Sequence, residues 1–378
     1  MFRGASKVAI FGVLFAIFFH LYTKLGINFH FHKHHPGDCR QVSGVDFGSE
    51  DMEVTQDGLA FITSGVDFPS NSPRFHAFLV EKNVQGRIFL FDFKKPELGA
   101  RAIKIRPSKN FDPETFQPHG ISMIEDRAKG TGNYLLYVVN HVKGGKDRVE
   151  KFRFSSASND LEHIRFFNDS AFHVLNDIAV TGEDQFYASN YLYFDSYFWS
   201  RFEHILPLPL GALLYVDAKG VTEVVPKLHG PNGVTLSKDK KFLYAAVPLQ
   251  GTMQVYERQR DNGLKLIQTV PEVQTSVDNF QLTSNGDALL AGAHPIPHKA
   301  LLHLEDPHFK APSSVLHLPL SNGRVVTEEI SELFYDQGDL ISGSSVAHIH
   351  SNQLLIGSII DKLVVCDLYT KPSQAGRL

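Results

Sequence analysis

Short runs of β-forming residues, separated by Gly, Pro, Asn and Asp, make up most of the chain after Cys39. Hydrophobic residues in this part almost never follow the helical period. Runs of this length and composition predict strands. Examples are 58–63, 87–91, 134–139, 212–216, 241–246 and 353–357. The pattern therefore predicts an all-β chain.

A small polar signature followed by an apolar residue recurs along the chain, and two or three further predicted strands lie in each interval. Its members are Asp57-Gly58-Leu59, His119-Gly120-Ile121, Asn176-Asp177-Ile178, Asn232-Gly233-Val234, Asp278-Asn279-Phe280 and Ser344-Ser345-Val346. Units of about 40–50 residues with four strands are typical of propeller blades. We therefore expect residues 39–378 to form one domain, a six-bladed β-propeller. A two-sheet sandwich is the alternative, but it would not explain a repeat of such long period.

The N-terminal part differs from the rest, because residues 8–22 are almost all apolar. At about 1.5 Å per residue this run spans roughly 22 Å, less than the roughly 30 Å of a bilayer's hydrocarbon core. Extension to Ile27, with Lys24 snorkelling, lengthens it to a full span. A cleaved signal peptide and a retained signal anchor both fit. Small residues are poorly placed for cleavage near position 22, which favours the anchor.

This interpretation gives a cytoplasmic tail at 1–7, a signal anchor at 8–27 and a His-rich linker at 28–38. The propeller would then lie in the lumen of the endoplasmic reticulum or outside the plasma membrane. The stretch 29–35 holds four histidines. Such a stretch can bind a transition metal, but its composition favours a polar linker beside the membrane.

Two further features fit a secretory compartment. Cys39 and Cys366 lie at the two ends of the predicted propeller. They are either two unrelated buried thiols or a disulfide that closes the domain, which an oxidising compartment permits. Asn168-Asp169-Ser170 is a sequon, so Asn168 is a candidate glycosylation site.

Composition changes this picture little. With 43% hydrophobic and 21% charged residues, the chain is an ordinary globular protein rather than a disordered one or a polytopic membrane protein. The formal net charge is −4, so no overall basic field attracts nucleic acid.

The innermost strand of each blade lines the central channel of a propeller, so polar groups of the repeats converge there. They are Glu50-Asp51, Asn176-Asp177, Asn232 and Asp278-Asn279. Any one such pair commonly starts a turn. Together, however, their carboxylate and amide oxygens suit Ca²⁺, which takes 6–8 oxygen ligands. Adjacent residues of a strand point to opposite sides and could serve two ions.

These residues also carry a resemblance to a known family. Gly48-Ser49-Glu50-Asp51-Met52-Glu53 with the following 58–62 resembles the start of the paraoxonases, the serum arylesterase/lactonase family. Six further motifs follow in the same order: 117–122, 137–141, 175–178, 231–234, 277–279 and 354–357. The similarity covers essentially all of 39–378.

The resemblance implies a six-bladed propeller with two calcium ions in its channel. It implies a catalytic ion bound by Glu50, Asn176, Asn232, Asp278 and Asn279. It implies a structural ion bound by Asp51, Asp177 and the backbone oxygen of Ile121. It further implies that His119 deprotonates the attacking water with His141 as the second member of a dyad, and that Cys39 and Cys366 are disulfide-bonded.

Two departures from the family lie near this site. An Asp-His pair usually follows the Asn that is Asn190 here, and Tyr191-Leu192 stands in its place. Ala293 stands where a free cysteine often precedes the His-Pro pair. The aromatic segment 191–199 is expected either to pack over the channel mouth as a loop or short helix, or to form a lid or membrane contact.

The expected function is a membrane-tethered, calcium-dependent hydrolase of lactones or aryl esters. The alternative is a non-catalytic paraoxonase-like membrane protein that assists the assembly or stability of other membrane proteins, such as ion channels. The altered Tyr191-Leu192 positions and the single anchor motivate this alternative. Retained calcium ligands do not separate the two, because the ions would also hold the channel strands together.

Overall fold

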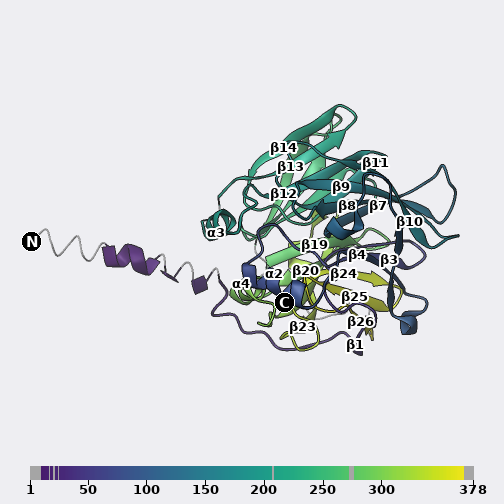
Figure 1. Ribbon diagram of the computed structural model, residues 1–378. Helices are drawn as coiled ribbons and strands as arrows, with labels where there is room; N and C mark the ends of the chain where they lie inside the picture. Colours follow the sequence, from purple (N-terminus) through teal and green to yellow (C-terminus); the bar gives the residue numbers. More distant parts are fainter. Residues whose placement is uncertain are drawn as a thin grey trace, which may run out of the picture.

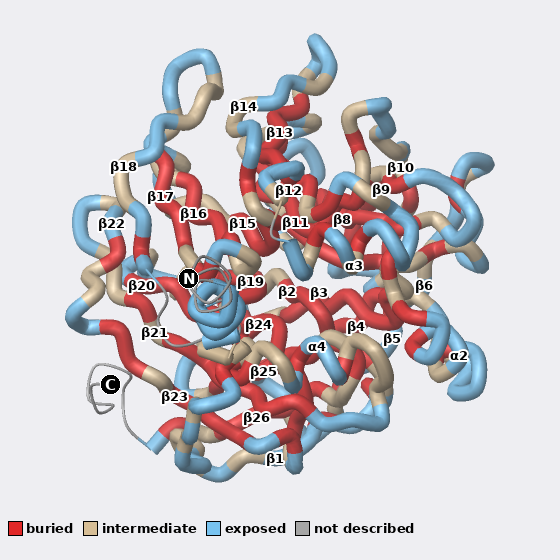
Figure 2. The backbone as a smooth tube through the Cα atoms, turned by 90° about the vertical axis from the view of Figure 1, so that its left-hand side faces the viewer, coloured by how far each residue is buried: buried red, intermediate tan, exposed pale blue. Residues whose placement is uncertain are grey.

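The computed structural model describes residues 10–16, 18–19, 22–23, 25–206, 208–271 and 276–369. Within them the chain forms six sheets arranged around a common centre (Figures 1 and 2). Buried strands lie toward the centre and exposed ones at the rim (Figure 2). The structure therefore confirms the predicted six-bladed β-propeller.

Each sheet is one blade, built mostly from hairpin-connected antiparallel strands. The first is β2 (Met52–Val54), β3 (Leu59–Ser64), β4 (Arg87–Asp92) and β5 (Ala100–Ala102). The second is β7 (Pro118–Glu125), β8 (Asn133–His141), β9 (Asp147–Ser155) and β10 (Asp160–Phe167), with β6 (Lys104–Arg106) parallel to β10. The third is β11 (Val174–Gly182), β12 (Gln185–Leu192), β13 (Gly211–Asp217) and β14 (Gly220–Leu228).

The second half of the chain repeats this arrangement. The fourth blade is β15 (Val234–Leu236), β16 (Phe242–Val247), β17 (Thr252–Arg258) and β18 (Leu264–Pro271). The fifth is β19 (Ser276–Leu282), β20 (Ala288–His294), β21 (Ser313–Ser321), β22 (Arg324–Val325) and β23 (Ser331–Asp336). The sixth is β24 (Ser344–His350), β25 (Gln353–Ser358) and β26 (Val364–Asp367), completed by β1 (Cys39–Gln41).

The first strand of the chain closes the ring, because β1 pairs with β26 in the last blade. The same two strands carry a disulfide between Cys39 and Cys366, 327 residues apart in sequence. The predicted closing disulfide is thus confirmed. The sheets run from Cys39 to Asp367, and residues 370–378 of the predicted domain lie outside the described part.

The six example strands of the sequence analysis are all strands, shifted by no more than two residues at either end. One member of the repeat was wrongly assigned. Asp57 and Gly58 form the turn between β2 and β3, where Gly58 has a φ of 91°. The position equivalent to the other signatures belongs to Glu50-Asp51, immediately before β2.

In the described part of the propeller, three short helices interrupt the strands: α2 (Pro73–Glu81), α3 (Tyr197–Ile205) and α4 (Pro297–Glu305). The same residues contain three 3₁₀ turns, η1 (Pro96–Leu98), η2 (Pro113–Thr115) and η3 (Thr327–Glu329). Ser72 caps α2 by accepting a hydrogen bond from Phe75 N–H, and Pro73 occupies the first turn. All three helices lie at the end of the propeller from which the N-terminal segment projects (Figure 1).

The N-terminal segment contains a helical stretch at 10–16 whose apolar side chains are exposed. Among the described residues, no helix has the length and apolar character needed to cross a bilayer. The predicted tail 1–7 and several positions of the predicted anchor 8–27 lie outside these residues.

The His-rich linker 28–38 lies on the propeller. The backbones of His34 and Tyr335 in β23 exchange two hydrogen bonds. Lys33 Nζ lies 2.9 Å from Asp336 Oδ2, and the ring of Phe31 stacks on Tyr335 at 5.1 Å. The linker is therefore fixed along the edge of the fifth blade.

Candidate functional site

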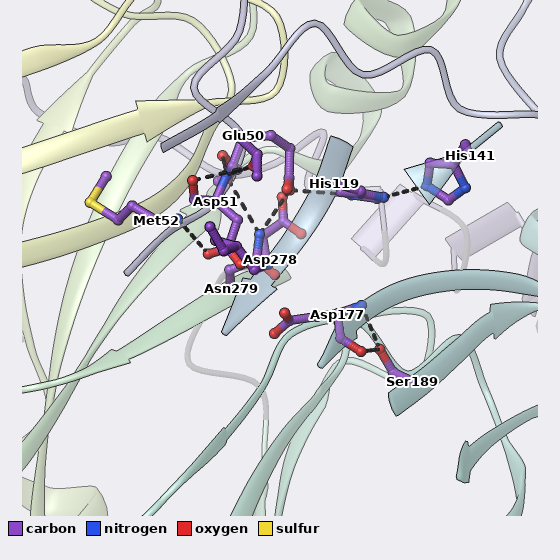
Figure 3. Close-up of polar contacts among 12 residues, drawn as sticks. Glu50, Asp51, Met52, His119, His141, Asp177, Ser189, Asp278 and Asn279 are labelled. Atoms are coloured by element: carbon purple, nitrogen blue, oxygen red, sulfur yellow. Dashed lines mark hydrogen bonds and ion pairs between the residues drawn. The ribbon is translucent and has the colours of Figure 1, made fainter. Parts of the chain in front are cut away.

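Five of the predicted calcium ligands gather in the central channel, at the inner strands. They are Glu50, Asn176, Asn232, Asp278 and Asn279, each between 1% and 9% exposed. Figure 3 shows Glu50, Asp278 and Asn279 close together beside His119. Asn279 Nδ2 donates a hydrogen bond to Glu50 Oε1 at 2.8 Å, which joins the first and fifth blades across the channel.

The channel strands approach one another closely enough only because two of their residues are glycines. A Cβ added to Gly120 would lie 2.5 Å from the backbone oxygen of Asn176. A Cβ added to Gly233 would lie 2.5 Å from the backbone oxygen of Asp278. Neither space tolerates a side chain. The glycines of the repeated signature therefore bring the neighbouring ligand residues together.

Four oxygens in this group are buried and have no hydrogen-bond partner among the described residues: Glu50 Oε2, Asn176 Oδ1, Asn232 Oδ1 and Asn279 Oδ1. Buried polar atoms are normally paired, so each unpaired oxygen costs about 1–3 kcal/mol. A bound cation that takes oxygen ligands would supply the partner that such oxygens lack. The donor set thus fits Ca²⁺.

The fit of this ligand set to a metal ion depends on its asparagine side chains. In the described part of the chain, no group of three or more His, Cys, Asp or Glu side chains is arranged to hold a metal. The candidate set draws on three amide oxygens, which suit a hard cation and not a transition metal.

Asp51 and Asp177 form a second, repeated arrangement in which each carboxylate bridges two blades. Asp51 accepts hydrogen bonds from Met52 N–H and, in the next blade, from Ile121 N–H, both at 2.8 Å. Asp177 accepts equivalent bonds from Ile178 and Val234, both at 2.7 Å. The predicted structural site therefore joins successive inner strands.

Burial and mutual repulsion favour the protonated, uncharged form of these carboxyl groups. Burial, followed by the charge of Asp278, raises the pKa of Glu50 well above its usual range. Burial raises the pKa of Asp51 and Asp177 in the same way, with Glu50 and Asp51 as their respective charged neighbours. A bound cation would allow these three buried carboxyl groups to ionise together.

His119 and His141 form the predicted dyad, with His119 Nδ1 2.8 Å from His141 Nε2. The other nitrogen of His119, Nε2, lies 3.4 Å from Glu50 Oε1 (Figure 3). Burial lowers the pKa of His119 to about 4, so the ring is neutral at pH 7. On its far side, His141 Nδ1 lies 2.9 Å from Asp147 Oδ2.

An aromatic cover lies over the dyad. The ring of Phe68 meets His119 and His141 edge-on, with centroids 5.2 and 4.8 Å apart, and contacts Tyr191 at 5.9 Å. Tyr191 donates to His204 Nε2 at 2.9 Å, because His204 Nδ1 is 2.7 Å from the carbonyl of Ser200. At Tyr191, where the family usually has the first residue of an Asp-His pair, the protein therefore places an aromatic ring against Phe68.

A cavity of about 260 Å³ adjoins this cover, and His141 and Phe68 contribute to its lining. Asp67, His76 and the loop Val142–Gly145 line it too. Leu192, the second departure, is fully buried in the third blade. Phe68 thus lines the cavity and also contacts His119, which is not one of the lining residues.

Other predicted positions lie elsewhere. Asn168 is exposed just after β10, accessible as a sequon requires. The predicted aromatic segment 191–199 divides between the end of β12 and α3, on which Phe198 and Trp199 are 60% and 52% exposed.

Sequence reasoning missed Phe68 and Asp147 as neighbours of the site, and it gave His294 no role beyond its place in the His-Pro pair. His294 Nε2 lies 3.0 Å from Asp278 Oδ2. Asp147 had a signal, because the Gly144-Gly145 turn predicts a hairpin that places it beside His141. Those two residues are indeed paired in register. Nothing local to the sequence links Phe68 to the dyad.

Comparisons with known proteins match most of the chain. The arylesterase family model matches residues 30–368. The chain is 32% identical to serum paraoxonase/lactonase 3 of Rattus norvegicus over 335 residues, 88% of this chain and 89% of that relative. It is 31% identical to human serum paraoxonase/arylesterase 2 over 332 residues, 87% and 88% of the two chains.

Solved structures resemble it in fold alone. A luciferin-regenerating enzyme superposes with a TM-score of 0.51 at 10% identity, covering 89% of this chain and 97% of that chain. The calcium-binding protein regucalcin from Agrobacterium tumefaciens gives the same TM-score and identity, with coverage of 89% and 96%. The family match and the identity to the paraoxonases are decisive: the chain belongs to the arylesterase (paraoxonase) family.

Proposed function

We propose that this protein is a calcium-dependent hydrolase of aryl esters or lactones. The observation that carries the proposal is the set of four unpaired, buried oxygens at the inner strands, one of which belongs to Glu50, a neighbour of His119. The names of the paraoxonase relatives, arylesterase and lactonase, support the same reaction class.

In this proposal Glu50, Asn176, Asn232, Asp278 and Asn279 hold the catalytic Ca²⁺. Asp51, Asp177 and the backbone oxygen of Ile121 hold a structural one. The catalytic ion supplies a Lewis acid that polarises the ester carbonyl.

In this proposal the protein's own histidines accept the proton of the attacking water. His119 is neutral at pH 7, because burial keeps its pKa at about 4. Its Nε2 faces the ligand group through Glu50, so this nitrogen is placed to accept a proton from an attacking water. His141, 2.8 Å from the other nitrogen, holds the ring in place.

We further propose that the protein is tethered to a membrane of the secretory pathway, with the propeller lumenal or extracellular. Exposed apolar side chains of the N-terminal segment support the tether, among them Phe11 and Phe18. The exposed aromatic face of α3 lies at the same end of the propeller (Figure 1). The closing disulfide and the exposed Asn168 are compatible with an oxidising, glycosylating compartment.

The test is hydrolysis of a lactone series and an aryl-ester series by the purified full chain in detergent. We expect turnover with Ca²⁺, none after chelation, and recovery when Ca²⁺ is restored. His119→Gln should abolish turnover without unfolding the protein, while His32→Gln, an exposed histidine of the linker, should leave it intact. Full turnover by His119→Gln would refute the proposed mechanism.

One observation favours the second candidate, a non-catalytic protein that assists other membrane proteins. Phe68 lies against both dyad rings and His119 is only 6% exposed, so little of this ring is open to a substrate. A folded, calcium-loaded protein without turnover on either series would support that candidate.

A further inference from the structure

His141, the second histidine of the dyad, has a further hydrogen-bond partner that the paraoxonase resemblance did not supply. Asp147 begins β9 and is directly opposite His141, the last residue of β8. Its Oδ2 lies 2.9 Å from His141 Nδ1. His141 and Asp147 are only 2% and 5% exposed, so water does not compete for this contact.

Asp147 is itself held from the neighbouring blade. The same oxygen, Oδ2, accepts a hydrogen bond from Leu175 N–H at 2.8 Å. Leu175 lies in β11, one residue before the candidate ligand Asn176. The carboxylate is therefore fixed by both the second and the third blade.

These contacts determine where the protons lie on both rings. A carboxylate only accepts hydrogen bonds, so His141 Nδ1 carries the hydrogen. In a neutral imidazole the other nitrogen, Nε2, is then an acceptor, and His119 Nδ1 must donate to it. His119 Nε2 is left with its lone pair, on the side of Glu50.

We propose that Asp147 is a positioning residue that sets the tautomers of His141 and His119, and so leaves His119 Nε2 free to accept a proton. Its consequence for turnover rests on the proposed hydrolase function. The tautomers themselves do not depend on that function, since they follow from the hydrogen bonds alone.

Asp147→Leu removes this acceptor and keeps a side chain of similar size. Asparagine would not serve, because Oδ2 accepts from both His141 and Leu175 N–H, and an amide oxygen in the same place could keep both bonds. With leucine, nothing requires a hydrogen on His141 Nδ1. Both rings can then adopt either tautomer, and part of the protein carries a hydrogen on His119 Nε2.

The first measurement is ¹⁵N NMR of the full chain in detergent, labelled at histidine and loaded with Ca²⁺. His119→Gln and His141→Gln assign the two rings. We expect both rings as Nδ1–H tautomers in the wild type, and a mixture of tautomers in Asp147→Leu. A wild-type His141 that carries its hydrogen on Nε2 overturns the proposal, even if the Leu variant fails to fold.

The second measurement is turnover. Asp147→Leu should lower kcat by roughly 10-fold or more with little change in KM, because His119 Nε2 is protonated in part of the protein and cannot act as a base there. Asp147→Glu, which keeps a carboxylate, should recover part of the loss. Full kcat in Asp147→Leu overturns the positioning role.

Glu150→Gln is the matched control. Glu150 is also a buried carboxylate of β9 and lies 2.9 Å from a buried histidine, His163, but it touches neither dyad ring. It should leave both tautomers and turnover unchanged. If the wild type shows the expected tautomers but no turnover on any ester or lactone, the hydrolase proposal fails while the tautomer assignment is supported.

Discussion

Cys39 and Cys366 face each other in the register of β1 and β26 and are disulfide-bonded. The bond therefore reinforces strands that already pair, and it links two ends of the chain 327 residues apart. A cross-link over so long a loop restricts the unfolded chain strongly.

We expect the double variant Cys39→Ser/Cys366→Ser to fold but to lose roughly 2–5 kcal/mol of unfolding free energy. Denaturant unfolding with and without reductant measures this loss. Reductant should weaken the wild type and leave the variant unchanged. Equal stability of wild type and variant would mean that the β1–β26 pairing alone closes the ring.

Removal of calcium should destabilise the propeller, because Asp51, Asp177 and Glu50 then repel one another in the channel. At a calcium concentration of 100 times Kd, the ion contributes about 2.7 kcal/mol. Asp177→Asn removes one buried charge while its side-chain oxygen can still accept from Val234 N–H. We therefore expect chelation to lower the Tm of this variant by less than half as much as that of the wild type.

Differential scanning calorimetry with and without chelator gives these shifts. Asp261→Asn, at an exposed turn, serves as the control and should respond to chelation like the wild type. A wild-type Tm that does not respond to chelation would count against the structural ion.

The strands were predictable because alternation of β-forming runs and turn residues is a local property. The signature of the inner strands was also readable, since close contacts at Gly120 and Gly233 require glycine there. Asp57-Gly58 was misassigned for a local reason too: Asp-Gly is a common hairpin turn as well as a repeat signature.

What remained hidden depends on contacts between distant segments. The cover formed by Phe68 and Tyr191 joins a loop of the first blade to a strand of the third. The linker's attachment pairs His34 with Tyr335 across some 300 residues of chain. Composition alone indicated a polar linker beside the membrane, because the sequence does not show that His34 and His35 contact carboxylates of the fifth blade.

The ion pair between Lys33 and Asp336 should hold the linker on the fifth blade. Asp336 is fully buried, so loss of its cation leaves a poorly compensated charge. We expect Lys33→Met to increase chymotryptic cleavage at Phe29 and Phe31 several-fold. Lys82→Met, which removes a surface pair with Glu81, is the control, and equal cleavage in both variants would show that backbone pairing suffices.

Acid should weaken the sixth blade through His348. Burial, with a smaller contribution from His350, lowers the pKa of His348 to about 3, against about 6.5 in the unfolded chain. The folded state therefore binds this proton less well than the unfolded one. Stability from the neutral ring is complete above pH 6.5 and is lost progressively as the pH falls toward 3.

His348→Phe removes this titration. Between pH 6.5 and 4 we expect the variant to lose less unfolding free energy than the wild type, by up to about 3 kcal/mol. Urea titrations at a series of pH values measure the difference. His32→Gln, at an exposed histidine, should follow the wild-type curve, and a parallel curve for His348→Phe would exclude His348 as the source.

Phe68 should control access to the dyad, because its ring lies against both histidines and borders the cavity beside His141. Phe68→Ala joins this cavity to the space around His119. If the proposed hydrolase function holds, we expect kcat/KM to rise for esters with bulky acyl groups and to fall for small ones, which lose a packing surface. Phe309→Ala, at an exposed phenylalanine beyond α4, should change neither. A uniform loss for all substrates would instead mean that Phe68 holds the two histidine rings in place.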